Sequence, residues 1–230
     1  MRGRFNARRL IIGTLWTIIG TAGIGLGSAC FRTASMGLDA LGSLVTGTSQ
    51  LTGFSYGNCQ LGINLVILVI MLFAHREAIG IGTLISMSGV GYVSDFGVWL
   101  IRDVFGLTDP SLIVRIIFLI PGLFFLGFGI ALYMSPRLGT CPYDDVPVML
   151  EMVTKKKLPF VYGRIVTDIV AMLLGIGFCL LADQTVLLVL GVGTVFNAVL
   201  TGPIIKFCRD HITEKLVKRS MGITTEEGGA

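Results

Sequence analysis

The sequence predicts an all-α integral membrane protein: six transmembrane helices form two inverted three-helix repeats, each with a short re-entrant or interfacial helix after its first span. Of the 230 residues, 53% are hydrophobic and only 14% are charged, whereas soluble domains carry about a quarter charged residues. The apolar residues also come in runs near the roughly 20 residues that cross a bilayer core. Short motifs repeated in the two halves of the chain predict the symmetry.

Six apolar runs define the predicted spans, at residues 10–30, 58–74, 79–101, 112–134, 161–182 and 185–205. With the N-terminus in the cytoplasm, 15 of the 18 Lys and Arg residues fall on the cytoplasmic side. Because basic loops favour that side, we expect both termini there, as a basic segment 1–9 and a polar tail 208–230. An eight-span alternative would need residues 142–153 to cross, and that segment is too short and too polar.

The repeats are residues 10–105 and 112–207, and their motifs recur in the same order. The matches are Gly23-Ile-Gly25 with Gly127-Phe-Gly129, Gly37-Leu38-Asp39 with Pro142-Tyr143-Asp144, Tyr56-Gly57 with Tyr162-Gly163, and Gly80-Ile-Gly82-Thr83 with Gly191-Val-Gly193-Thr194. Three spans per half is an odd number, so the second half enters the membrane from the opposite side. The alternative is that two hairpins rich in glycine and aliphatic residues resemble each other by composition.

Residues 37–53 and 142–153 are predicted to form the two short helices. Asp39 stands at the start of the first, and Pro142 followed by Asp144 at the start of the second, where these residue types favour a helix N-terminus. Two such segments that meet about a pseudo-two-fold axis would line a shared cavity. Alternatively, both lie flat on opposite membrane surfaces, and Asp39 and Asp144 act only as caps.

Few polar side chains lie in or beside the spans, and these form the candidate site for a small solute or ion: Asp39, Asp144, Asp168, Asn64, Asn197 and Ser86. Asp168 lies about seven residues into the fifth span, with Asn64 as its approximate counterpart. It either lines a pathway or pairs with Arg164 one turn earlier. Asn197 and Ser86 either bond across helices or coordinate a solute. Asp95, near the end of its span, is expected to reach solvent.

The repeated motif supplies a second set of residues, whose backbone is expected to matter: Gly80, Gly82, Thr83, Gly191, Gly193, Thr194, Gly202 and Pro203. Close packing of helices is the ordinary role of such glycines. Gly23 and Gly27 make a further GxxxG face on the first span.

Enzyme signatures are absent from the sequence. It has two histidines, His75 and His211, and no HExxH, GxSxG or P-loop pattern. The five cysteines have no CxxC spacing. We therefore expect no catalysis, cofactor, metal site or nucleic-acid partner. The expected partners are the lipid bilayer and a small solute or ion, and assembly into a homo-oligomer stays open.

One family resemblance covers about residues 10–207. The run Ser35-Met-Gly37-Leu38-Asp39-Ala-Leu41, followed by Tyr56-Gly57, resembles the first half of the YczE/YyaS/YitT-type bacterial membrane proteins, and the run from Gly191 to Pro203 resembles their closing motif. The first motif of that family often reads Ser-Pro-Trp-Asp, and this chain departs from it at Gly37 and Leu38. The family is largely uncharacterised, so the resemblance implies a multi-span protein of the bacterial inner membrane without a named substrate.

Two functions from different classes follow. The first is a secondary transporter or permease of a small solute, in which Asp39, Asp144 and Asp168 bind a cation, a proton or an amino group. The alternative is a non-transporting membrane scaffold or regulatory accessory protein. Charge-neutral replacement of the three carboxylates distinguishes them, because a transporter loses activity while it stays folded.

Overall fold

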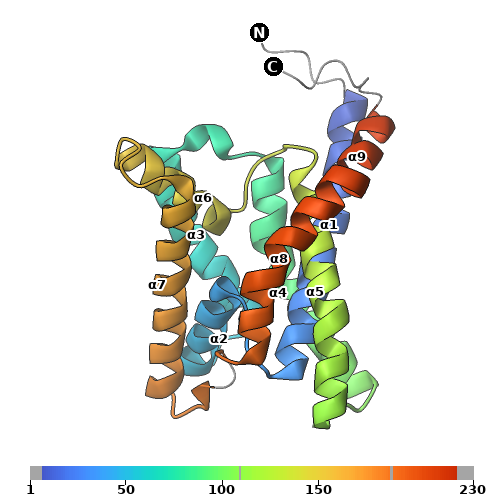
Figure 1. Ribbon diagram of the computed structural model, residues 1–230, viewed down its shortest axis with the longest axis vertical. Coiled ribbons are helices and arrows are strands. Elements are labelled where there is room, and N and C mark those ends of the chain that lie inside the picture. The colour runs from blue at the N-terminus through green and yellow to red at the C-terminus, as the bar shows by residue number, and fades with distance from the viewer. Residues whose placement is uncertain (1–6, 109, 187–188, 222–230) are drawn as a thin grey trace.

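The computed structural model describes residues 7–108, 110–186 and 189–221, and these residues form helices and turns without a strand. Five helices are long and apolar enough to cross a membrane: α1 (Ala7–Ala34), α3 (Tyr56–Ala74), α4 (Ile81–Trp99), α5 (Leu112–Met134) and α7 (Phe160–Leu181). They run along the long axis of the molecule (Figure 1). The predicted all-helical, membrane-type architecture is confirmed at this level.

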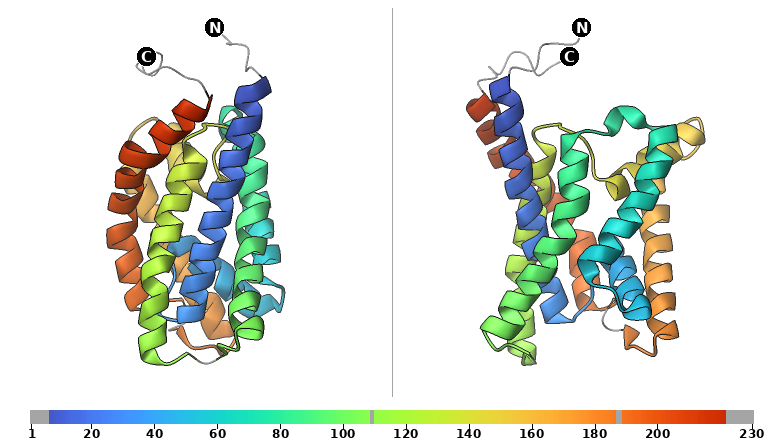
Figure 2. Two further views of the ribbon diagram at one scale, coloured as in Figure 1. Left: turned by 90° about the vertical axis from the view of Figure 1, so that its right-hand side faces the viewer. Right: turned by 180° about the vertical axis from the view of Figure 1, so that it is seen from behind.

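The direction of the long helices alternates along the chain. In Figures 1 and 2, α1 and α4 run downward and α3 runs upward, whereas α5 and α8 (Val192–Cys208) run upward and α7 runs downward. The first helix and the last therefore bring the two ends of the described chain to the same end of the molecule.

The prediction for the span at residues 185–205 is wrong at its start. The helix there, α8, begins only at Val192 and holds 17 residues. The residue before it, Gly191, is extended with a φ of −167°. Upstream, the buried Val189 turns its carbonyl oxygen toward α2 (Ala40–Thr52), where it accepts a hydrogen bond from Ser43 Oγ at 2.9 Å. These contacts hold Val189 and the residues from there to Gly191 out of the helix.

The polar tail packs against the helices over its described part, residues 208–221. A π-helical turn, η4 (Arg209–Thr213), continues α8 into α9 (Glu214–Met221). Trp16 Nε1 on α1 donates to Ser220 Oγ at 2.8 Å, and the buried Val217 packs beside Leu132 of α5. The end of the predicted tail and the first residues of the basic N-terminal segment lie outside the described residues.

Both predicted short helices are confirmed. The first is α2, with Asp39 as its N-cap residue and Gly53 as its C-cap at a φ of +74°. The second is α6 (Pro142–Val153), which has its proline at the first helical position. The remaining short elements are η1 (Arg76–Ala78) and the π-helical turn η2 (Leu100–Val104).

Glycines bring α1 and α5 into close contact. A Cβ atom on Gly27 would lie 2.8 Å from the Gly122 carbonyl oxygen, and one on Gly129 would lie 2.7 Å from the Gly20 carbonyl oxygen. The predicted packing role of Gly27 is therefore confirmed, since small residues let helix backbones approach. The glycines of α1 and α5 match at a separation of 102 positions, in the pairs Gly20 and Gly122, Gly25 and Gly127, and Gly27 and Gly129.

Two matching junctions attach a loop from each half to a helix start in the other. After α1, the Met36 carbonyl oxygen accepts from Gly193 N at 2.7 Å, at the start of α8. After α5, the Leu138 carbonyl oxygen accepts from Gly82 N at 2.9 Å, at the start of α4. In each half, the repeated Gly-x-Gly-Thr motif is thus the place that binds a loop from the other half.

The threonine side chains of these motifs accept hydrogen bonds from the motif backbone at each junction. Gly80 N donates to Thr83 Oγ1 at 3.1 Å, and Gly191 N donates to Thr194 Oγ1 at 3.3 Å. Both threonine side chains are buried. This arrangement satisfies a backbone donor that the start of a helix would otherwise leave unpaired.

The loops also correct the register of the predicted repeat. Gly37 has a φ of +101° and Gly139 has a φ of +124°, conformations that favour glycine. A Cβ atom on either residue would collide with the hydroxyl oxygen of a motif threonine, Thr194 for Gly37 and Thr83 for Gly139. The structural partner of Gly37 is therefore Gly139, again 102 positions away, and not the predicted Pro142.

One predicted packing glycine does not pack. A Cβ atom on Gly202 would meet no atom within 4 Å, and its neighbour Pro203 is exposed. Both residues lie on the outer face of α8, so no helix within the described part of the chain makes the predicted close approach at Gly202.

Candidate functional site

A cluster of charged and phenolic side chains joins α6 to α7; we call it the α6–α7 cluster. Arg164 Nη1 donates to Asp144 Oδ1 and Arg164 Nε donates to Asp168 Oδ2, each at 3.0 Å. The hydroxyl of Tyr143 donates to Asp168 at 2.7 Å, and that of Tyr133 donates to Asp144 at 2.9 Å. Asp144 and Asp168, both predicted, are thus brought together by one guanidinium.

Local sequence explains the geometry of the α6–α7 cluster. Pro142 starts α6 and leaves Asp144 in the first turn, where a carboxylate is favoured by the helix dipole. Arg164 and Asp168 are four residues apart and share one face of α7. The predicted pairing of Arg164 with Asp168 is confirmed. The side chains of the three ionised residues remain 30–38% exposed, so solvent still reaches the cluster.

Asp39 lies near the α6–α7 cluster without joining it through a side-chain hydrogen bond among the described residues. It is the N-cap residue of α2, in the segment between α1 and α2. Burial raises the pKa of its carboxyl group, and the negative charge of Asp168 acts in the same direction. This carboxyl group therefore holds a proton more readily than an aspartic acid in water.

Replacing Asp39 with Asn is expected to raise stability above about pH 4 and to leave it unchanged below. The ordinary pKa of the group is 3.8, and its pKa in the folded protein is higher. The wild-type protein therefore loses stability as pH rises from about 4 toward the folded-state pKa, whereas Asn does not ionise. Thermal unfolding between pH 4 and 8 should show a difference in melting temperature between Asp39→Asn and the wild type that widens as pH rises. Asp103→Asn, at an exposed position, controls for the general effect of replacing a carboxyl group with an amide. A difference that stays constant with pH, or that changes sign, contradicts a raised pKa for Asp39.

A second cluster, which the sequence did not predict, joins α1, α3 and α4. Arg32 Nη1 donates to Asp95 Oδ1 at 2.8 Å and to Ser94 Oγ at 3.0 Å. Gly57 N donates to Asp95 Oδ2 at 2.7 Å, and the Arg32 guanidinium lies 4.1 Å from the Tyr56 ring centroid. Asp95, which was expected to reach solvent, is 26% exposed and is in addition held by these partners, which the sequence did not predict. The only sequence signal was the presence of a charged residue in or beside two apolar runs, and it does not identify Arg32 and Asp95 as partners.

Buried polar side chains on α3 extend from this second cluster. Ser94 Oγ donates to Ser28 Oγ at 3.2 Å, and Ser28 Oγ lies 3.3 Å from the Tyr56 hydroxyl. Tyr56, Gln60 and Asn64 are spaced by four residues, so they lie along one face of α3, and each is at most 4% exposed. The second cluster is therefore continued by a line of buried polar groups.

The same line reaches the α6–α7 cluster. Cys141 Sγ lies 3.8 Å from Asn64 Oδ1, and Cys141 N donates to the Tyr133 hydroxyl at 3.4 Å. Tyr133 in turn donates to Asp144. We call the whole series from Asp95 to Asp168 the polar chain. Within it, Gln60 Oε1 is buried and has no hydrogen-bond partner among the described residues, and such an atom costs about 1–3 kcal/mol unless water or a solute satisfies it.

The remaining predicted residues lie at different places. Ser86 is buried, donates to the Thr83 carbonyl oxygen at 3.1 Å and lies beside Cys141, so it borders the polar chain. Asn197 is buried on α8, where its Oδ1 accepts from Thr201 at 2.7 Å. The described contacts do not connect Asn197 to the polar chain.

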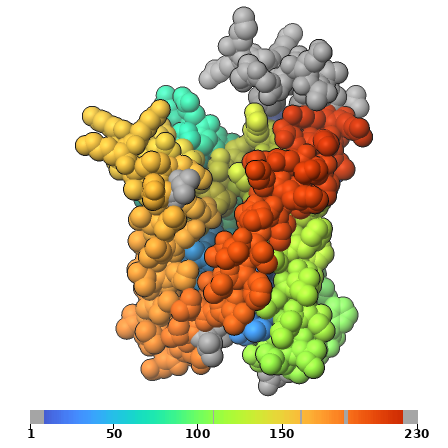
Figure 3. Space-filling model, in the orientation of Figure 1, coloured from blue at the N-terminus to red at the C-terminus, as the bar shows by residue number. Residues whose placement is uncertain are grey.

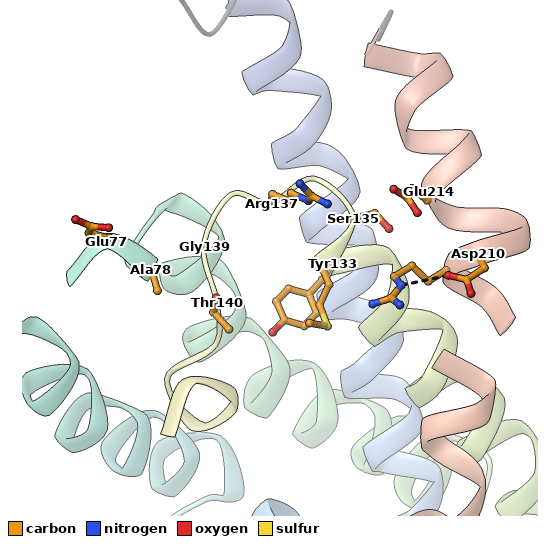
Figure 4. A pocket seen from close by; sticks show the side chains of 11 residues that line it. Glu77, Ala78, Tyr133, Ser135, Arg137, Gly139, Thr140, Asp210 and Glu214 are labelled. Carbon is orange, nitrogen blue, oxygen red and sulfur yellow. Dashed lines mark hydrogen bonds and ion pairs between the residues drawn. The ribbon is translucent and has the colours of Figure 1, made fainter. Parts of the chain in front are cut away.

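A pocket of about 580 Å³ lies beside the polar chain, toward the end of the molecule at which α1 begins (Figure 4). Its wall comes from η1, the end of α5, the loop before α6, and the η4–α9 segment. The polar lining residues are Glu77, Tyr133, Ser135, Arg137, Thr140, Arg209, Asp210 and Glu214. Tyr133 belongs to both the pocket and the polar chain, since its hydroxyl reaches Asp144.

Comparison with known proteins adds one finding. A family described as a family of unknown function, DUF6198, matches residues 11–210. The chain belongs to the DUF6198 family. The match covers both halves of this DUF6198 chain, both clusters and the full polar chain. Neither a curated protein nor a solved structure matches it.

Proposed function

We propose that this DUF6198 chain is a secondary transporter or permease of a small solute, which crosses the bacterial inner membrane six times with both termini in the cytoplasm. The sixth crossing is α8, whose 17 residues reach the lower end of the range of roughly 17–25 residues that cross a bilayer core. The basic ends of the chain and its resemblance to the YczE/YyaS/YitT-type proteins support this placement.

In this proposal the two halves are inverted repeats that meet along α1 and α5. The opposite directions of α1 and α5, and of α4 and α8, support it (Figure 2). So do the glycine pairs and the loop carbonyls of the two junctions, Met36 and Leu138, which all match at 102 positions, and the helix starts at Gly82 and Gly193, which match at 111. Inverted halves of this kind place a solute site between them and expose it to alternate sides of a membrane.

The observation that carries the proposal is the polar chain. It runs from the Arg32–Asp95 pair along one polar face of α3, and from Asn64 past Cys141 to the carboxylates of Asp144 and Asp168. Polar and ionised groups are costly inside apolar helices, and those that persist there typically mark a pathway for a solute or ion. A hollow between α7 and α8 exposes part of the first half on the face in Figure 3.

The second candidate function, a membrane scaffold or regulatory accessory protein, also has an observation in its favour. Arg164 binds both Asp144 and Asp168, so its positive charge offsets one of the two carboxylate charges. These contacts can serve to hold α6 on α7. A scaffold needs these contacts but no route for solvent along the polar chain. The accessibility of that route therefore separates the two functions.

Cys141 is a natural reporter of accessibility, because it is the thiol within the polar chain. The variant Cys30→Ala, Cys59→Ala, Cys179→Ala and Cys208→Ala leaves it as the sole cysteine. Burial raises the pKa of Cys141 to about 12, so it reacts slowly unless the surrounding helices open. If the protein is a transporter, a membrane-impermeant quaternary-ammonium methanethiosulfonate should modify Cys141 from both sides of the membrane. Right-side-out and inside-out vesicles measure the two sides separately.

The matched control keeps Cys179 in place of Cys141. Cys179 is fully buried in α7 and outside the polar chain, so it should stay unmodified in both vesicle preparations. Modification of Cys141 from neither side, or from one side only under every condition, would reject the transporter and favour the scaffold.

A further inference from the structure

The charges around the pocket are distributed unevenly. Arg209 Nε lies 3.4 Å from Asp210 Oδ1, and Glu214 Oε1 lies 2.8 Å from Lys218 Nζ. Each of these carboxylates therefore already has a cationic partner. Arg137 forms no ion pair with any residue that the structure describes. The contact of Arg209 with Asp210 uses Nε, so its terminal nitrogens remain available for another acceptor.

The fold holds the backbone of Arg137 at the pocket in a defined conformation, and its side chain is exposed. It sits in the loop between α5 and α6 with a φ of +55°, directly before Leu138, whose carbonyl oxygen binds Gly82 of α4. Two residues further on, Thr140 N donates to the Ala78 carbonyl oxygen at 3.1 Å. The loop is thus tied at two points to the segment that begins α4, which fixes the pocket wall.

The opposite wall carries Arg209 on the π-helical turn η4. Such turns interrupt an α-helix and are frequent at functional sites, because the extra residue redirects the side chains around it. Here the turn is held against α5, where Thr213 Oγ1 donates to the Ala131 carbonyl oxygen at 3.3 Å. Two guanidinium groups on separate, anchored segments therefore border one pocket.

Neutral hydrogen-bonding groups complete the lining. Figure 4 shows Tyr133 and Thr140 on the side of the pocket away from Asp210 and Glu214, and Glu77 at its far edge with its carboxylate turned away. A guanidinium donates in a planar fork that matches the oxygens of carboxylate and phosphate groups. The centre of the pocket thus offers donors to an anion, and its carboxylates are paired or turned outward.

We infer that this pocket is a binding site for an oxyanion, a carboxylate or phosphate group, held between Arg137 and Arg209. The inference deepens the proposed function and rests on it only in treating the bound anion as the transported solute. Tyr133 then lies between the bound anion and the carboxylate of Asp144. That position suits an anion that moves together with a proton or cation.

Binding is tested on the full-length protein purified in detergent, by isothermal titration with succinate and with inorganic phosphate as probes. The wild type should bind at least one probe. Arg137→Gln and Arg209→Gln should each raise the Kd on the order of tenfold, because hydrogen bonds to charged groups are among the stronger ones. Arg76→Gln is the matched control, since Arg76 is exposed next to the pocket and does not line it.

The source of the anion is tested in nanodiscs. Thermal stabilisation by phosphatidylglycerol over phosphatidylcholine, lost in Arg137→Gln, would identify a lipid headgroup as the source, whereas binding of the soluble probes would identify a free solute. No binding in either format, or binding that Arg137→Gln and Arg209→Gln leave unchanged, overturns the site. If an anion binds but Cys141 is not accessible from both sides, the anion site stands and the proposal of transport fails. If Cys141 is accessible from both sides but no anion binds, the proposal of transport stands and the anion site fails.

Discussion

Replacing Arg164 with Gln is expected to lower the free energy of unfolding by on the order of 2 kcal/mol. The change removes the cation that lies 3.0 Å from both Asp144 and Asp168, and leaves two carboxylates near each other and near Asp39. Removing one partner of a fully buried ion pair costs about 3–5 kcal/mol. The smaller figure applies here because these side chains are about a third exposed, which screens the charges. Thermal or denaturant unfolding of the purified protein measures the loss.

A second substitution tests whether charge balance is the cause. In Arg164→Gln with Asp168→Asn, one of the two unpaired negative charges is gone, and the amide oxygen can still accept from the Tyr143 hydroxyl. The double variant should therefore recover a large part of the lost stability. If it is as unstable as Arg164→Gln alone, the arginine stabilises through packing and not through its charge.

Replacing Gly175 with Ala is expected to destabilise the protein by about 1–3 kcal/mol, the range of overpacking in a well-packed interior. Helices α2 and α7 touch at this point, and a Cβ atom on Gly175 would collide with the Ser43 carbonyl group. A Cβ atom on Gly47 would in turn collide with the Gly175 carbonyl oxygen. Because both neighbours are backbone atoms, the clash is relieved only if a whole helix moves.

The same helix supplies the control. Gly177 is two residues away in α7, and a Cβ atom there would meet no atom within 4 Å, so Gly177→Ala should be neutral or stabilising by up to about 1 kcal/mol. The difference between the two variants isolates the contact with α2 from the intrinsic preference of alanine for helix. Similar melting temperatures for both variants would show that α2 is not seated against α7 in this way.

The short helices were predictable because their signals are local. Asp39 followed by apolar residues, and Pro142 followed by Asp144, mark helix starts within one turn of sequence, and α2 and α6 begin there. The i, i+4 spacing of Arg164 and Asp168 likewise predicted their contact. The start of α8 at Val192 was missed, because contacts with α2 override an apolar run that could itself have been helical.

Long-range contacts set the limit of prediction at the candidate site. Arg32 and Asp95 pair across 63 positions, and nothing near either residue in the sequence identifies the other. The three-residue error in the repeat register has a similar origin. Matching carboxylates suggested that Asp39 corresponds to Asp144, whereas the backbone conformations of Gly37 and Gly139 match these two glycines instead.

The two junctions between the halves have a consequence for synthesis of the chain. Residues 10–105 leave the ribosome first, yet the start of α4 lacks its partner until Leu138 has been made, and the loop at Met36 waits for Gly193. Neither half is complete alone, so a chain that stops after α4 should be a substrate for membrane proteases. Co-expression of the two halves as separate chains should then protect both, because each carries the loop that finishes the other.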